Sequence, residues 1–453
     1  MRVLIVGGGV SGLYLSLLLS RQANTFDVLL LNRERSVGGR LLSYKSIKGE
    51  ILEMGAMRIP SHHRHTLALC SDLGLELSLF NGTTLFEDLS NLTIDTADLD
   101  EGLTVGTSPS IFQNGVLRFC RIDQECEVPI DWLFIKLSLR LTEHGIELKD
   151  LSFAELVHLV LTRKEEQRFW LELGYDHLRF NDVSAIYVLA NGFVTSKTSS
   201  LYYTVSTGMQ SIANTLYTKV LHNGVRVLTN ETVISVFKRD SGYSIKTIHG
   251  AEFYCDLLVF AIPPKEIIRL HTSNSFLDLD YRAALNDIGY YASTKTYATF
   301  PADSSFTSRL NSGFFTTSLP IRQCHFNPCG SRMIHNSHTI LAEYRNLFSN
   351  HTDCTDTPSS IEDIVHCLNC ILHTALDDPL FYSSLDWSNV QSCVTAHYWK
   401  TGSSPSKAIA KLQSLDANLG FTGEAISLGQ GWVEGALDSS QSLCNSIVKR
   451  YRD

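Results

Sequence analysis

RVLIVGGGVSGLYLSLLLS, residues 2–20, is the stretch that decides the fold. Residues 2–6 form an apolar, β-branched run, residues 12–20 are apolar enough for a buried helix, and VLLL at 28–31 is a second apolar run. A strand, a helix and a second strand in this order make a βαβ unit. The N-terminus therefore predicts an α/β fold with a Rossmann-like domain.

Three glycines, Gly7, Gly9 and Gly12, stand between the first strand and the helix. They match the G-x-G-x-x-G fingerprint of dinucleotide-binding turns, in the strand-to-helix context that this fingerprint requires. The glycines let the backbone approach a pyrophosphate, which then rests on the positive end of the helix. We therefore predict that this turn, with Ser11 inside it, binds a dinucleotide; the alternative is a Gly-rich turn without a ligand.

Asn32 stands where the fingerprint expects an acidic residue, about 20 residues after the last glycine. An acid at this place binds the ribose hydroxyls of the adenosine half. An asparagine carbonyl can still accept from a hydroxyl, but without charge assistance. We therefore expect a weak ribose contact from Asn32, and tighter binding after Asn32→Glu, unless Arg33 and Arg35 receive an extra phosphate.

Length and composition exclude several classes of protein. The 453 residues are enough for two or three domains, and 44% apolar with 19% charged residues is ordinary globular composition. The formal charge of −9 argues against nucleic acid as a partner, because proteins that bind phosphate backbones carry a basic excess.

Other features favour a reducing compartment. The 11 cysteines are odd in number and scattered, which does not suit a disulfide scaffold. No run reaches the ~18 apolar residues of a membrane-spanning helix, and the N-terminal apolar run leads into glycines without a signal-peptide cleavage region. We expect a cytoplasmic protein that starts at Met1 and has no membrane span.

The nucleotide-binding domain is expected to be discontinuous. A long, mostly helical insertion, with helices expected at 132–141 and 153–161, precedes strand-like runs at 225–229, 232–238 and 257–262. A last strand and helix follow residue 419. We expect this domain to consist of residues 1–64, 205–262 and 415–453. Residues 65–204 and 263–414 then form an α+β substrate domain with a helical insertion.

Three further motifs resemble those of the flavin-containing amine oxidase family. Gly38-Gly39-Arg40 follows the second strand, EMGAMRIP occupies residues 53–60, and the C-terminal part carries FTGEA at 421–425 and GWVEGAL at 431–437. The resemblance spans essentially the whole chain and is weakest in the middle helical part. It implies that the dinucleotide is FAD.

The resemblance also assigns cofactor contacts. In the family the Gly-Gly-Arg turn contacts the FAD pyrophosphate, the second motif passes beneath the flavin ring, the acid of the third binds near the ribitol, and a strand valine meets the adenine. These roles fall on Gly39, Arg40, Gly55, Ala56, Met57, Arg58, Val233, Gly423, Glu424, Trp432 and Val433. Residues 394–443 contain no cysteine, and monoamine oxidases attach their flavin in this stretch, so the resemblance implies noncovalent FAD.

Within the family, residues 57–60 are similar to L-amino acid oxidases, in which the arginine, here Arg58, holds the substrate α-carboxylate. A guanidinium can grip a carboxylate through two parallel hydrogen bonds. Residues 316–322 resemble the strand that leads to a substrate-contacting tyrosine, and His325 stands at that position. A histidine can donate to a carboxylate but titrates near neutrality, which would alter the pH dependence.

The remaining catalytic roles also come from the resemblance. Lys295 would hold a water next to flavin N5, the Gly431 carbonyl would accept a hydrogen bond from the substrate amine, and Trp432 would form one wall of the pocket. Short matches at 173–176 and at Tyr398-Trp399 resemble a bacterial L-tryptophan oxidase of violacein synthesis.

The implied reaction is oxidative deamination of an L-amino acid. Hydride passes from the α carbon to the flavin, the imino acid hydrolyses to a 2-oxo acid and ammonia, and oxygen takes the electrons to give hydrogen peroxide. The sequence leaves open the accepted side chain, a quinone in place of oxygen, and the assembly state, with a homodimer among the options.

Two rival functions and two further motifs complete the expectations. The rivals are an oxidase of amines or polyamines, or a desaturase, whose substrates lack the carboxylate, and a flavin-binding protein without turnover. His62-His63-x-His65 lacks a matching ligand set, so we expect surface histidines and no metal site. Cys367 and Cys370 lie inside the helical pattern 361–372, which favours buried helix cysteines over a redox pair.

Overall fold

The structure is a computed structural model of the whole chain. It describes residues 1–22, 25–46, 49–80, 111–113, 116–118, 150–180, 182–190, 202–301, 313–317, 319–326, 337–347, 359–372, 375–390 and 394–451. The helix expected near 132–141 lies outside these residues.

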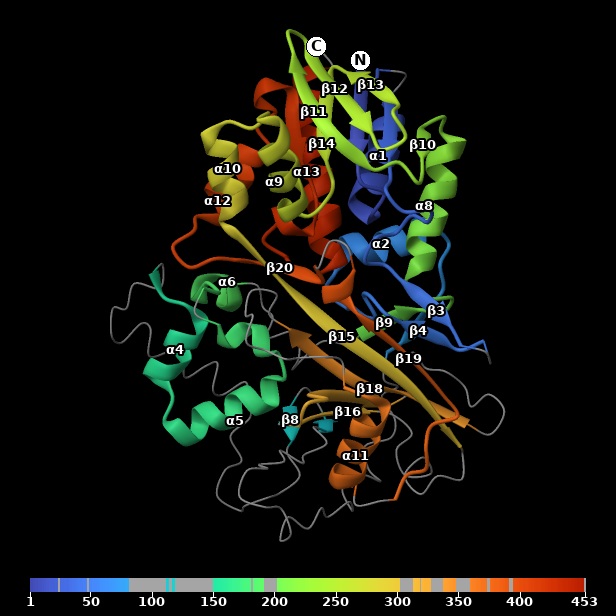
Figure 1. Cartoon of the computed structure of the whole chain (residues 1–453), viewed down its shortest axis with the longest axis vertical. Helices are drawn as coiled ribbons and strands as arrows, with labels where there is room; N and C mark the ends of the chain where they lie inside the picture. The colour runs from blue at the N-terminus through green and yellow to red at the C-terminus, as the bar shows by residue number, and fades with distance from the viewer. Residues whose placement is uncertain are drawn as a thin grey trace.

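A five-stranded parallel sheet lies in the upper half of the molecule (Figure 1). Its order is β10-β2-β1-β14-β21, formed by β1 (Arg2–Val6), β2 (Asp27–Leu31), β10 (Arg226–Leu228), β14 (Leu257–Phe260) and β21 (Leu419–Phe421). The parallel sheet confirms the α/β fold. It takes strands from all three segments expected to build the nucleotide-binding domain, whose exact boundaries stay predictions.

Three helices pack together beside this sheet: α1 (Val10–Ser20), α8 (Gln210–His222) and α13 (Val433–Tyr451). The leucines at 13, 15, 17 and 19 of α1 are all buried. A helix that is apolar on every side is a buried one, and α1 contacts β1, β2, α8 and α13. The apolar sequence of α1 thus places the Gly-rich turn that precedes it in the interior of the molecule.

A second, antiparallel sheet occupies the lower half of Figure 1. The long strand β15 (Ile288–Pro301) lies between β18 (Ser337–Leu347) and β19 (Phe381–Asp386) and also pairs with β20 (Ala396–Trp399). The sheet continues through β17 (Gln323–Phe326) to β16 (Gly313–Thr316), and α11 (Ile361–Leu372) packs on it. Because β15 runs between the two halves, its side chains can reach the nucleotide-binding half.

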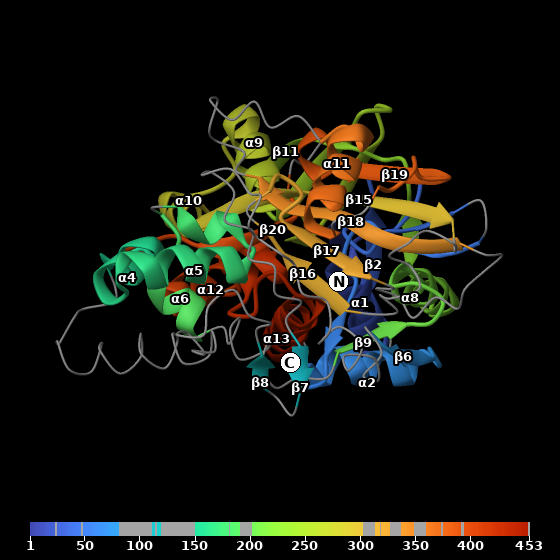
Figure 2. The same ribbon diagram turned by 90° about the horizontal axis from the view of Figure 1, so that it is seen from below.

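The helical part of the chain lies to one side of both sheets (Figures 1 and 2). It consists of α4 (Phe153–Val160), α5 (Arg163–Leu173), the short η3 (Asp176–Arg179) and α6 (Ala185–Ala190). Capping boxes open α4 and α5: Ser152 with Glu155, and Thr162 with Glu165. The helix expected after Ser152 is therefore confirmed.

Smaller elements connect these parts. They are β3 (Ser43–Lys45), β4 (Ile51–Glu53), β5 (Ile59–Pro60), α2 (Arg64–Asp72), β6 (Leu77–Leu79), β7 (Ile111–Gln113), β8 (Val116–Arg118), β9 (Tyr202–Val205), β11 (Val233–Arg239), β12 (Gly242–Thr247), β13 (Glu252–Cys255), α9 (Pro264–Asn274), α10 (Leu279–Asn286), α12 (Pro405–Leu412), and the 3-10 turns η4 (Trp387–Asn389), η5 (Asp416–Asn418) and η6 (Glu424–Ile426). None of the helices in the described residues is long and apolar enough to cross a membrane.

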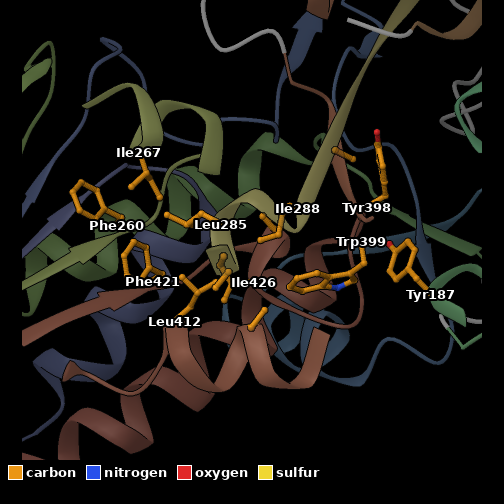
Figure 3. Close-up of a cluster of buried hydrophobic side chains, with 14 of the residues drawn as sticks. Tyr187, Phe260, Ile267, Leu285, Ile288, Tyr398, Trp399, Leu412, Phe421 and Ile426 are labelled. Atoms are coloured by element: carbon orange, nitrogen blue, oxygen red, sulfur yellow. The ribbon is translucent and has the colours of Figure 1, made fainter. Parts of the chain in front are cut away.

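One hydrophobic core joins the two halves (Figure 3). Phe260 and Phe421, from neighbouring strands of the parallel sheet, stack with ring centroids 5.8 Å apart. The same cluster continues through Ile288 at the start of β15 to Trp399 on β20. The halves are thus packed as one body around the space between them.

Candidate active site

A cavity of about 840 Å³ extends between the parallel sheet and β15. It begins at the turn after β1, passes the segments 38–42 and 422–425, and reaches Arg58 and Trp432. Its volume is within the usual range for ligand and cofactor pockets. The sequence motifs from both ends of the chain therefore meet around one cavity.

The Gly-rich turn needs its glycines for two different reasons. A Cβ on Gly12 would lie 2.0 Å from the Gly7 oxygen, and Gly7 itself has a φ of +117°. Gly9 has no other heavy atom within 4 Å of the place of a Cβ, so the backbone there is open to the cavity. The first turn of α1 also carries no acidic residue. This cradle suits a pyrophosphate at the positive end of α1.

Asn32 lies at the expected place, at the end of β2 and in the cavity wall, but the protein itself engages its side chain. The carbonyl oxygen accepts from the Gly8 amide at 3.1 Å. The amide group donates to the carbonyls of Glu34 at 2.8 Å and Ser36 at 2.9 Å. Asn32 thus ties the Gly-rich turn to the loop after β2, and its ribose contact stays a prediction.

Arg40 and Glu424 form an ion pair of 2.9 Å in the cavity wall. Glu424 also accepts from the amide and ring of His397, at 2.9 and 2.8 Å, and from the Gly431 amide at 3.0 Å. Burial alone would raise the pKa of Glu424, but the Arg40 charge, His397 and these hydrogen bonds hold it well below its usual range. Glu424 therefore stays ionised and joins the Gly-Gly-Arg turn to the C-terminal motif at 421–425.

The segment that is expected beneath the flavin is held in place by contacts from several directions. A Cβ on Gly55 would lie 1.9 Å from the Arg40 oxygen, so only glycine fits against the Gly-Gly-Arg turn. The Trp387 indole donates to the Met54 carbonyl at 2.9 Å. The Lys295 ammonium donates to the carbonyls of Glu53 at 3.0 Å and Gly55 at 2.6 Å.

Lys295 lies in the middle of β15, only 3% exposed, in the wall of the cavity. Its cross-strand neighbour is Tyr344 on β18, and the ammonium lies 5.1 Å from that ring. The family resemblance predicts this lysine near the flavin, and in the structure it lies in the cavity wall beside the 53–58 segment. Its role toward a water at N5 stays a prediction.

Arg58 enters the cavity among aromatic side chains. Its guanidinium donates to the Tyr175 hydroxyl at 2.7 Å and lies 4.9 Å from the Tyr202 ring and 6.0 Å from the Trp432 ring. Burial alone would lower its pKa, but the nearby tyrosine hydroxyls raise it above the usual value, so Arg58 is charged. None of the ion pairs in the described part of the chain includes Arg58.

Tyr175 reaches Arg58 because two features fix its turn. Gly174 ends α5 in a left-handed conformation, with φ of +67°, and its carbonyl accepts from the Gln323 amide at 2.7 Å. Asp176 then forms a two-point ion pair with Arg322, at 2.6 and 2.9 Å. The helical part and the β16–β17 hairpin together hold the phenol in place.

His325 does not line the cavity. It is fully buried on β17, with its ring 6.3 Å from Phe80 and 6.5 Å from Tyr344. Tyr344 and Tyr175 form the cavity wall in this region instead. The structure therefore gives no support to a direct substrate contact from His325, and that role stays an untested prediction.

The other predicted cofactor residues reach the cavity wall. They are Gly7, Gly9, Ser11, Gly39, Ala56, Met57, Val233, Gly423, Gly431, Trp432 and Val433, whereas Gly12 is not among the lining residues. His63 corrects one expectation, since it is buried rather than on the surface and packs against Trp432 with centroids 5.0 Å apart. Burial lowers its pKa to about 4. Cys367 is a buried helix residue, as expected, whereas Cys370 of the same helix is only half-buried.

Sequence reasoning missed several residues of the site. Tyr291, Tyr344, His397 and Glu231 all line the cavity, and none of the sequence motifs includes them. His397 directly precedes the Tyr398-Trp399 pair, which is the part of this stretch that carries the resemblance. Among the described residues, no group of three or more His, Cys, Asp or Glu side chains could hold a metal ion.

Parts of the chain are similar to curated oxidases. A stretch of 80 residues is 41% identical to an L-amino-acid oxidase of Mus musculus and covers 17% of this chain and 12% of that protein. A stretch of 90 residues is 34% identical to the flavin-dependent L-tryptophan oxidase RebO of Lentzea aerocolonigenes, covering 19% of each. The matched stretches thus span less than a fifth of the length of these relatives.

Two further comparisons extend over the whole chain. A solved structure of a putrescine oxidase double mutant, redesigned in its cofactor binding, has a TM-score of 0.72 at 17% identity and covers 99% of this chain and 100% of that one. This likeness is one of fold. The family model of flavin-containing amine oxidoreductases matches residues 10–448. The chain therefore belongs to the flavin-containing amine oxidoreductase family.

Proposed function

We propose that the protein is an FAD-dependent L-amino acid oxidase. It binds FAD noncovalently, oxidises an L-α-amino acid to the imino acid, which hydrolyses to a 2-oxo acid and ammonia, and passes the electrons to oxygen. The observation that carries this proposal is the position of Arg58, a charged guanidinium in the cavity wall with no carboxylate partner among the described residues.

The cavity suits the cofactor at each end of its length. The open backbone at Gly9 and the N-terminus of α1 suit the pyrophosphate, and the 53–58 segment with Lys295 suits the flavin ring. FAD, when bound, supplies the hydride acceptor that the side chains of a protein lack. No cysteine lies in residues 394–443, which supports noncovalent attachment.

The residues of the chain then bind and orient the substrate. Arg58 would grip the α-carboxylate, and the Tyr175 hydroxyl, which accepts one guanidinium hydrogen at 2.7 Å, would fix the plane of that grip. Trp432, 6.0 Å from the guanidinium, would close the other side. This geometry would hold the α carbon over the flavin, and orientation is the main contribution that a protein makes to such a step.

The amine end would face Gly431. The amide of Gly431 donates to Glu424 at 3.0 Å, which fixes the peptide next to Trp432. Its carbonyl would then accept from the substrate amine. Lys295, held by two backbone carbonyls, would position a water at the flavin.

Arg58→Ala tests the substrate assignment. Removing a charge-assisted, two-point contact in a closed pocket and leaving a carboxylate unpaired typically costs ~2–5 kcal/mol. We therefore expect anaerobic flavin reduction by an L-amino acid, followed by stopped flow, to fall by roughly 10²-fold or more, with unchanged FAD content. Arg226→Ala, an exposed arginine paired with Asp27 outside the cavity, is the control.

The same measurement separates the rivals. An Arg58→Ala enzyme with full activity on amines would favour an oxidase of amines or polyamines, because those substrates carry no carboxylate. A wild-type flavin that stays oxidised with all twenty L-amino acids and with amines would favour a binding protein without turnover. Loss of FAD from the variant would place Arg58 with the cofactor alone.

A further inference from the structure

The adenosine end of the cavity lacks an acid at the place where the fingerprint expects one. Asn32 stands there, and its two amide hydrogens donate to the carbonyls of Glu34 and Ser36, with its oxygen bonded to the Gly8 amide. Asn32 therefore offers the ribose hydroxyls only an uncharged amide whose groups already form hydrogen bonds within the protein.

An acidic residue from another segment lies beside this position. The Glu231 amide donates to the Asn32 carbonyl at 2.9 Å, so the chain segment that leads into β11 runs alongside the end of β2. Glu231, Thr232 and Val233 all line the cavity. Val233 is the residue whose backbone is expected to meet the adenine, and Glu231 precedes it by two positions.

Glu231 also has an oxygen that the described protein does not satisfy. Its Oε2 is buried and has no hydrogen-bond partner among the residues that the structure describes. A buried polar atom without a partner is costly and indicates a ligand or water that completes it. The unpaired oxygen of Glu231 is a separate observation from the absence of an acidic residue at position 32.

The other acids of the cavity wall already have cationic partners. Four carboxylates line the cavity within the described residues. Glu34 pairs with Arg33 at 2.9 Å, Glu266 with Arg269 at 2.8 Å, and Glu424 with Arg40 at 2.9 Å. Glu231 is the member of this set for which no cation lies within ion-pair distance in the described structure.

We propose that Glu231 binds the ribose hydroxyls of the adenosine half of the dinucleotide, in place of the acid that is missing at position 32. The inference rests on the proposed binding of FAD and names the group that holds one part of it. A carboxylate accepts from vicinal hydroxyls through charge-assisted hydrogen bonds, which are stronger than those to an amide. In this proposal the ribose-binding carboxylate belongs to the segment beside β2 instead of to the end of β2.

The test compares two nucleotides on the full chain after removal of FAD. Titration calorimetry with ADP and with 2′,3′-dideoxy-ADP isolates the contribution of the ribose hydroxyls. We expect the wild-type protein to bind ADP at least about tenfold more tightly than the dideoxy nucleotide. In Glu231→Ala the two nucleotides should bind with nearly equal affinity, whereas Glu34→Ala, a nearby acid in the same wall, should keep the preference.

Glu231→Gln keeps the shape of the side chain and guards against misfolding of the alanine variant. It should lose most of the preference for ADP and release FAD from the holoprotein about tenfold faster, measured as the rise in flavin fluorescence on dilution. Full discrimination between the nucleotides in both Glu231 variants would overturn the proposal. A wild-type chain that binds neither ADP nor FAD would instead overturn the flavin assignment on which it rests.

Discussion

The side chain of Asn32 forms its hydrogen bonds with backbone groups of neighbouring segments. Its amide donates to the carbonyls of Glu34 and Ser36 and accepts from Gly8. Asn32→Glu would remove both donors and place a negative charge against two carbonyl oxygens, beside Glu231. We therefore expect FAD to bind about tenfold more weakly, which reverses the expectation from the sequence.

Flavin fluorescence titration of the FAD-free chain measures this effect. Asn223→Glu introduces the same charge at an exposed position after α8 and should leave the affinity unchanged. Tighter FAD binding by Asn32→Glu would show that the ribose, rather than the loop after β2, is the partner that matters for this residue.

Glu53 is a second residue whose environment makes a measurable prediction. Burial raises its pKa to about 7, although hydrogen bonds from Ser43 and the Met209 amide and the charge of Lys295 lower it. The folded protein therefore holds a proton that the unfolded chain releases above about pH 4.5. This bound proton stabilises the folded state fully below about pH 4.5, and its contribution to the free energy of unfolding is lost as the pH rises through about 7.

Glu53→Gln should remove this pH dependence. Between pH 4.5 and 8, the free energy of unfolding of the wild-type protein should fall by up to about 3 kcal/mol more than that of the variant. Urea unfolding at each pH measures this difference. Glu34→Gln, an exposed acid, is the control and should follow the wild type. Parallel profiles for the wild type and Glu53→Gln would show that the carboxyl is ionised throughout.

At the scale of elements, the 53–58 segment depends on close contact with the Gly-Gly-Arg turn. A Cβ on Gly55 would lie 1.9 Å from the Arg40 carbonyl, which belongs to backbone and cannot rotate away. Gly55→Ala must therefore displace the segment that carries Arg58 and the carbonyls that hold Lys295. We expect purified Gly55→Ala protein to contain much less flavin by its ~450 nm absorbance, whereas Gly429→Ala, with neighbours no closer than 3.5 Å, should retain it.

We expect the junction between η3 and the β16–β17 hairpin to affect substrate binding rather than FAD binding. Asp176 and Arg322 pair at 2.6 and 2.9 Å and fix the turn that presents Tyr175 to Arg58. Asp176→Ala should raise the KM for the amino acid about tenfold, since the tyrosine would no longer hold the guanidinium in one orientation. FAD content should stay constant, and an unchanged KM would exclude this positioning role.

These elements also show which parts of the site the sequence could predict. The Gly-rich turn, the 38–40 turn and the 53–58 segment are local motifs whose glycines are required by backbone geometry, and all three reach the cavity. Tyr344 reaches it because β18 pairs with β15, which places Tyr344 opposite Lys295. Nothing within a few residues of Tyr344 marks that outcome, because register and packing are set by the whole fold.

At the scale of the whole molecule, the cavity wall is built from distant parts of the chain. Residues 7–11, 231–233 and 422–425 surround one end, and residues 54–58, Lys295 and Trp432 surround the other. The core continues from Phe260 to Trp399 across both halves. A ligand that contacts all of these segments stabilises the folded state as a unit, because the unfolded chain cannot present them together.

Removal of FAD should therefore lower the thermal stability of the entire chain. A noncovalent ligand at 100 times its dissociation constant adds about 2.7 kcal/mol, and at 1,000 times about 4.1 kcal/mol. We expect the Tm of the FAD-free chain to be several degrees lower in calorimetry, with one transition that moves upward as FAD is added back.

Riboflavin, which lacks the pyrophosphate and adenosine, should restore little of this shift, because it leaves the Gly-rich turn and the Glu231 end empty. Acid or heat should release intact FAD into the supernatant, whereas flavin that stays with the denatured chain on a gel would contradict noncovalent attachment. Equal Tm values with and without FAD would show that the cavity is fully formed by protein packing alone.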